Sequence, residues 1–137
     1  MKKIPLSKLR NAALKVRSRA YAPYSKFPVG AALESSNGSI FSGCNVENLS
    51  FGLTTCAERN AVFAAVAAGS RSFKRIVIIA DSAEPVTPCG ACRQVLAEFS
   101  ENLEIICENL QGETFCSTLT QLLPRSKNGI LDYRCST

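Results

Sequence analysis

Three cysteines in two short segments are the residues of this chain best suited to metal chemistry. Cys89 and Cys92 are three positions apart, near an expected helix start, in the segment PCGAC (88–92). That spacing allows two thiolates to hold one tetrahedral zinc ion. Cys56 begins a second expected helix and can supply a third sulfur. Three protein ligands leave the fourth position open to water, which is typical of catalytic rather than structural zinc sites.

A carboxylate two residues after Cys56 could move the protons at such a site. The chain contains no histidine, which excludes serine triads, Cys–His nucleophiles and histidine bases. Glu58 is therefore the expected general acid and base. Three thiolates around Zn²⁺ carry a net negative charge, which Arg59 or Arg93 could offset by donating a hydrogen bond to sulfur.

Each of these residues also has a simpler interpretation. A CxxC segment alone fits a redox pair or half of a structural zinc site, and a single cysteine is often a small buried hydrophobe. Thr55 and Glu58 match a capping box, and Arg93 fits a surface charge equally well. The zinc interpretation rests on the conjunction of two ligand segments that each open a helix.

The apolar pattern predicts the elements that would bring these helix starts together. A helix begins after Pro5 and ends before Pro23, and strands over 29–33 and 39–46 form a hairpin. From residue 39 to residue 107 the order is β-α-β-α-β, which favours parallel central strands covered by helices. The later expected elements are a helix over 56–68 capped by Thr55, a strand over 75–80, a helix from Pro88 to Phe99, strands over 103–107 and 113–116, and a helix over 118–123.

Composition narrows the class of protein. The chain has 137 residues, 46% hydrophobic and 20% charged, which indicates one ordinary globular domain over 1–137 with no membrane span and no secretory signal. Seven cysteines without such a signal favour a metal or redox site over a disulfide framework. Residues 1–26 are basic, with no acid before Glu34. This segment could contact nucleic acid, but a solvated helix face is the preferred interpretation.

At this point the chain resembles a known family. CAER (56–59) and PCGACRQ (88–94) are similar to the cytidine deaminases in their small zinc form, which have cysteine where other zinc deaminases have histidine. The likeness includes YSKFPVGAA (24–32), GCNVEN (43–48) and QLLP (121–124). It implies a three-layer α/β/α fold with a five-stranded mixed sheet and one Zn²⁺ per chain. The implied activity is hydrolysis of cytidine and 2′-deoxycytidine to uridine and 2′-deoxyuridine in pyrimidine salvage, by a cytoplasmic homotetramer.

The resemblance also implies roles for individual residues. Asn45 and Glu47 correspond to ligands of the ribose hydroxyls, Phe27 to an aromatic residue against the pyrimidine ring, and the Ala57 backbone to a contact with the base carbonyl. An amide and a carboxylate two positions apart on an extended chain can face one pocket. Tyr24 is expected to shape the same pocket. The simpler interpretations are a loop asparagine, a solvated glutamate and a core phenylalanine.

One position departs from the family pattern. Family members commonly have a phenylalanine three residues after Leu-Leu-Pro that reaches a neighbouring subunit's site, whereas this chain has Lys127 there. Tyr133 is a candidate substitute. The cysteines outside the proposed site are expected to be reduced packing or surface thiols: Cys44, Cys107, Cys116 and Cys135.

Three rival functions share some of these motifs. A polynucleotide-editing deaminase is disfavoured by the short chain, by the ribose-type N-x-E and by the tight turn over 109–112, which leaves no room for an extra helix. A zinc-stabilised binding module would need a fourth sulfur, from Cys44 or Cys107. A deaminase of nucleoside antibiotics is also disfavoured by the N-x-E.

Overall fold

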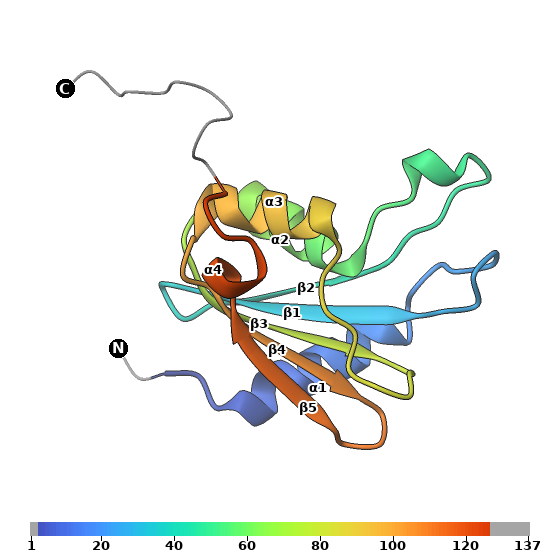
Figure 1. Ribbon diagram of the computed structural model, residues 1–137, viewed down its shortest axis with the longest axis horizontal. Helices are drawn as coiled ribbons and strands as arrows, with labels where there is room; N and C mark the ends of the chain where they lie inside the picture. Colours follow the sequence, from blue (N-terminus) through green and yellow to red (C-terminus); the bar gives the residue numbers. More distant parts are fainter. Residues whose placement is uncertain (1–2, 127–137) are drawn as a thin grey trace.

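The computed structural model describes residues 3–126, which form a five-stranded mixed sheet between two helical layers (Figure 1). The predicted α/β class and five-stranded sheet are confirmed. The expectations for Lys127, Tyr133 and Cys135 lie outside the described residues. In chain order the elements are α1 (Leu6–Arg17), β1 (Val29–Ser35), β2 (Ile40–Cys44), the 3₁₀ turn η1 (Phe51–Leu53), α2 (Ala57–Ala67), β3 (Phe73–Ala80), α3 (Gly90–Phe99), β4 (Glu104–Asn109), β5 (Thr114–Thr118) and α4 (Leu119–Leu122).

The strand order is β2-β1-β3-β4-β5, so β1 lies between the two strands that α2 connects. β1 is antiparallel to both neighbours, and β3 pairs in parallel with β4. β2, β3 and β4 therefore run in the same direction, and α2 and α3 lie together on one face of the sheet with α1 on the other (Figure 1). The predicted β-α-β-α-β order is confirmed.

Both faces of the central strands are buried, which explains the continuous apolar run of β3. Ile76, Ile78 and their neighbours pack under α2 and α3, whereas Val77 and Ile79 face Leu9 and Ala13 of α1. None of the described helices has the length and hydropathy required to cross a bilayer.

Two glycines let the helices approach the hairpin closely. A Cβ on Gly43 of β2 would lie 2.3 Å from the Ala61 nitrogen and 2.5 Å from the Ala57 carbonyl oxygen, both in α2. A Cβ on Gly30 of β1 would lie 2.1 Å from the Ala13 carbonyl oxygen in α1. The start of α2 is therefore held directly against the strand.

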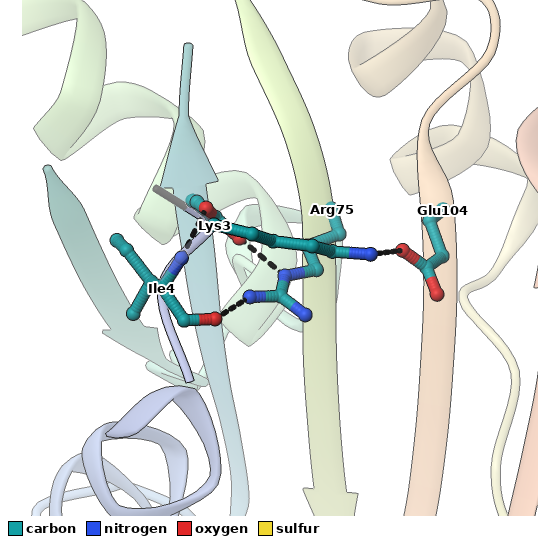
Figure 2. A network of polar contacts seen from close by, with 5 residues as sticks. Lys3, Ile4, Arg75 and Glu104 are labelled. Carbon is teal, nitrogen blue, oxygen red and sulfur yellow. Dashed lines mark hydrogen bonds and ion pairs between the residues drawn. The ribbon is translucent and has the colours of Figure 1, made fainter. Parts of the chain in front are cut away.

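A buried ion pair anchors the N-terminal segment to the sheet (Figure 2). Arg75 on β3 donates to the carboxylate of Glu34 on β1 and to the Ile4 carbonyl oxygen. The Ile4 nitrogen donates to the same carboxylate at 3.2 Å, and Lys3 contacts Glu104 at 3.5 Å. Both partners of the pair are almost fully buried, so these hydrogen bonds offset the cost of burying two charges.

The basic N-terminal segment is partly neutralised by acids from the later part of the chain. Lys3 pairs with Glu104 and Arg10 pairs with Glu108. The sequence separates these charges, but both acids lie on β4, whose Ile106 packs in one apolar cluster with Leu9 and Ala13 of α1.

Candidate active site

Two helices, α2 and α3, lie on the same face of the sheet, and each begins immediately after a cysteine. Cys56 is the N-cap of α2 and Cys89 is the N-cap of α3, and both have extended backbone. The predicted cap at Thr55 and the predicted first helical position at Pro88 are therefore wrong. Thr55 instead exchanges backbone hydrogen bonds with Val46, so the capping box is not formed.

Three sulfur atoms meet at these helix starts. The Sγ atoms of Cys56, Cys89 and Cys92 all lie within 4.8 Å of one another, and those of Cys56 and Cys89 are 4.0 Å apart. Tetrahedral zinc with Zn–S bonds of about 2.3 Å requires sulfurs roughly 3.8 Å apart, so the cluster fits this ion. Among the described residues, neither Cys44 nor Cys107 joins the cluster as a fourth ligand.

The groups around the sulfurs favour the thiolate form of Cys56, which is the form that binds a metal cation. Hydrogen bonds from Cys92 and from Arg59, whose Nη2 lies 3.3 Å from the Cys56 sulfur, lower the pKa of Cys56 to about 5 against the effect of burial. The hydrogen bond with Cys56, together with burial, raises the pKa of Cys92. The Arg59 Nε is buried without a partner among the described residues. A site of this kind, with three sulfurs and one guanidinium, suits a soft divalent cation.

Glu58 is a buried carboxyl group beside the sulfur cluster. It lies in the first turn of α2, and its side chain lines the same cavity as Cys56 and Cys89. Burial raises the pKa of Glu58, and the nearby negative charge of Cys56 raises it further. A carboxyl group whose pKa is raised holds a proton more tightly than an ordinary carboxylate, which suits a group that must both accept and return a proton.

A cavity of about 270 Å³ opens onto this cluster. It is lined by all four residues that the resemblance assigned to substrate binding, namely Phe27, Asn45, Glu47 and Ala57. Tyr24 does not line it and instead lies beside it. Its ring is in edge-to-face contact with that of Phe51, and the two ring centroids are 5.6 Å apart. Six other lining residues are not singled out by any sequence pattern: Ser25, Val29, Thr54, Ile78, Val86 and Thr87.

Asn45 holds the segment that carries Phe27. Its Oδ1 accepts from the Val29 nitrogen at 2.8 Å, and its Nδ2 donates to the Phe27 carbonyl oxygen at 2.9 Å. The side chain is 9% exposed, so these bonds are made in a nearly dry setting. One amide hydrogen and one oxygen lone pair are left over for a ligand.

Glu47 fixes the same segment from its other end. Its Oε1 accepts from the nitrogens of Tyr24 at 2.9 Å and Ser25 at 3.1 Å. A hydrogen bond from the Ser25 side chain lowers the pKa of Glu47, which favours its charged form. Together, Asn45 and Glu47 organise the 25–29 wall of the cavity as well as lining it.

Arg59 and Arg93, the two candidates for donating a hydrogen bond to a cysteine sulfur, have different surroundings. Arg59 contacts the Cys56 sulfur, whereas the donors of Arg93 go to oxygen atoms. Arg93 Nε donates to the Pro88 carbonyl oxygen at 2.7 Å, Nη1 to the Leu122 carbonyl oxygen at 3.0 Å and Nη2 to the Thr87 hydroxyl at 3.3 Å. The interpretation of Arg93 as a hydrogen-bond donor to sulfur is therefore wrong.

A three-layer α/β/α fold with three sulfurs and a buried glutamate at two converging helix starts is the arrangement of a zinc-dependent deaminase. Residues 4–108 match the model of the cytidine and deoxycytidylate deaminase zinc-binding region. The chain belongs to this family.

Proteins similar in sequence and in structure cover most of the chain. A cytidine deaminase of Sporosarcina psychrophila is 50% identical over 120 residues, which span 87% of this chain and 88% of that protein. A probable cytidine deaminase of Dictyostelium discoideum is 48% identical over 120 residues, 87% of this chain and 81% of that protein. The crystal structure of cytidine deaminase from Burkholderia pseudomallei aligns with a TM-score of 0.85 and 47% identity over 88% of this chain and 98% of that chain.

Proposed function

We propose that this chain hydrolyses cytidine and 2′-deoxycytidine to uridine and 2′-deoxyuridine, with release of ammonia, as a step of pyrimidine salvage. The observation that carries the proposal is the convergence of three sulfurs and the buried carboxyl group of Glu58 at one cavity. Relatives named cytidine deaminase, at up to 50% identity, support it.

The proton chemistry falls to one side chain. Cys56, Cys89 and Cys92 would hold the zinc ion, which lowers the pKa of water and polarises it for attack. Glu58 takes a proton from the attacking water as the new C–O bond forms at C4 of the pyrimidine. The same carboxyl group delivers that proton to N3. It then takes the second proton from the new hydroxyl group at C4 and passes it to the departing amine, so that the C4–N bond breaks, ammonia leaves and the C4 carbonyl forms.

The remaining lining residues would bind and orient the nucleoside. Phe27 packs against the pyrimidine ring, and the Ala57 backbone contacts the base carbonyl. Asn45 uses its remaining hydrogen-bonding capacity, together with Glu47, on the ribose hydroxyls. Arg59 offsets the negative charge of the three thiolates.

We also infer a homotetramer of single-domain chains, each spanning 1–137, located in the cytoplasm and without nucleic-acid or membrane partners. The segment between β2 and α2, which projects from the body of the molecule (Figure 1), supports the association of chains. Its side chains Leu49, Phe51 and Leu53 are 79%, 72% and 67% exposed. Clustered apolar side chains with such exposure indicate a contact with another protein surface.

Two measurements on purified protein test the activity. Elemental analysis should find one zinc per chain, and ultraviolet absorbance should record conversion of cytidine to uridine. Glu58→Gln should keep the zinc and the fold but lose about 10²- to 10⁴-fold in turnover, because the proton carrier is removed.

Two controls accompany these measurements. Glu98→Gln, the same chemical change at an exposed position of α3, should retain full turnover. Full activity in Glu58→Gln would contradict the assignment of the proton carrier. Turnover of single-stranded DNA but not of cytidine would instead favour a polynucleotide deaminase.

A further inference from the structure

We propose that Arg93 is a positioning residue that fixes the loop before α3, and thereby the Cys89 sulfur, so that its loss accelerates release of the metal. This inference rests on the proposed function, because it concerns the ion that function requires. Arg93 lies one helical turn after Cys89, and its backbone nitrogen donates to the Cys89 carbonyl oxygen at 2.9 Å. Its guanidinium group folds back over the residues that precede the cysteine.

The loop that carries Cys89 has few other attachments. Nine residues, 81–89, separate β3 from α3 without regular structure. Within the described part of the chain, residues 85–88 receive two hydrogen bonds, one at Pro88 and one at Thr87, and both come from Arg93. Pro85 and Pro88 have no N–H group to donate. Pro88 is buried, so without Arg93 its carbonyl oxygen would lose its hydrogen bond away from water.

The third donor of Arg93 connects the loop to a firmly held element. Nη1 donates to the Leu122 carbonyl oxygen at 3.0 Å, at the end of α4. A capping box between Thr118 and Gln121 closes the start of α4, and the Leu119 nitrogen donates to the Leu103 carbonyl oxygen at 2.9 Å. One guanidinium group therefore joins the loop, α3 and α4.

The position of the Cys89 sulfur depends on this connection. Cys89 is exposed, whereas Cys92 is buried within α3 and Cys56 is held by Arg59. Of the three sulfurs, that of Cys89 has the least support from surrounding packing. Because residues that orient metal ligands change metal affinity by about 10- to 100-fold, the effect should appear in the rate of metal release.

The test measures zinc transfer from the holoenzyme to a chromogenic chelator. Arg93→Met keeps the length of the side chain and removes all three donors, and should release zinc about 10- to 100-fold faster than the wild type. Arg93→Lys, which restores one charged donor, should fall between the two. Thr87→Val removes only the 3.3 Å hydrogen bond from Arg93 and should also speed zinc release, by less than Arg93→Met does. This variant provides the test if Arg93→Met does not fold.

Arg10→Met is the matched control, since it breaks an ion pair with Glu108 that involves α1 on the opposite face of the sheet. It should release zinc at the wild-type rate. If the wild-type protein binds zinc and converts cytidine, but the Arg93 and Thr87 variants also release zinc at the wild-type rate, the positioning role is refuted alone. A wild-type protein that binds no zinc and leaves cytidine unchanged refutes the proposed function, and this inference with it.

Discussion

Replacing Gly43 with alanine should move the catalytic helix, because the added methyl group would meet the backbone of α2. The Cβ would lie 2.3 Å from the Ala61 nitrogen and 2.5 Å from the Ala57 carbonyl oxygen. Neither atom belongs to a side chain that can rotate away. Ordinary contact begins at 3.4 Å, so α2 must shift by about 1 Å relative to β2. Cys56 and Glu58 are at the start of this helix and would shift with it.

Two effects of different size follow from that shift. Overpacking of this kind costs about 1–3 kcal/mol, so the free energy of unfolding in urea should fall by that amount with an unchanged m-value. A displacement of about 1 Å in a catalytic group can reduce turnover by about 10²-fold, so kcat/KM for cytidine should fall further than stability alone explains. Zinc content measured on the same sample would report the displacement of Cys56 directly.

Gly52→Ala is the control for Gly43→Ala, since its added methyl group meets nothing within 4 Å. It should keep wild-type stability and zinc content. If Gly43→Ala also unfolds at the wild-type urea concentration and retains its zinc and turnover, then close backbone packing does not position the site.

Two further predictions concern charge. Arg75→Met leaves the carboxylate of Glu34 buried without its partner and should lower the free energy of unfolding by about 3–5 kcal/mol. Lys3→Met, which breaks the exposed pair with Glu104, should cost less than about 1 kcal/mol; equal losses in urea titrations would contradict this ranking. In zinc-free protein, the pKa of Cys56 is lowered to about 5, whereas burial raises the pKa of Cys107 to about 12. Iodoacetamide at pH 7 should therefore modify Cys56 and spare Cys107 in mass spectra, with reaction at Cys56 lost as the pH falls through 5; faster labelling of Cys107 would refute this order.

The order of the elements could be predicted from sequence because each has a strong local pattern. The continuous apolar run at 75–80 and the helix after Cys56 both appear where they were expected. The cap positions could not be predicted in the same way. Thr55 and Pro88 have the intrinsic preferences of helix starts, but in the folded chain Cys56 and Cys89 take the N-cap positions with extended backbone, and their sulfurs meet.

The contacts that organise the cavity depend on residues far apart in the chain. Asn45 is bound to Phe27 and Val29 across 16 to 18 positions, and Arg93 reaches Leu122 across 29. A local pattern identifies the residue types but not which oxygen each donor will find. The four predicted lining residues came from resemblance to a family, which records such long-range contacts indirectly.

The separation of Cys56 and Cys89 along the chain has a thermodynamic consequence. An ion bound by both sulfurs would close a loop of 33 positions along the chain, as a disulfide between the two cysteines would. Restricting the unfolded chain in this way corresponds to about 3–4 kcal/mol in the loop-entropy treatment of cross-links. The ion would then act as a reversible cross-link, and the fraction of folded protein would depend on the concentration of free metal.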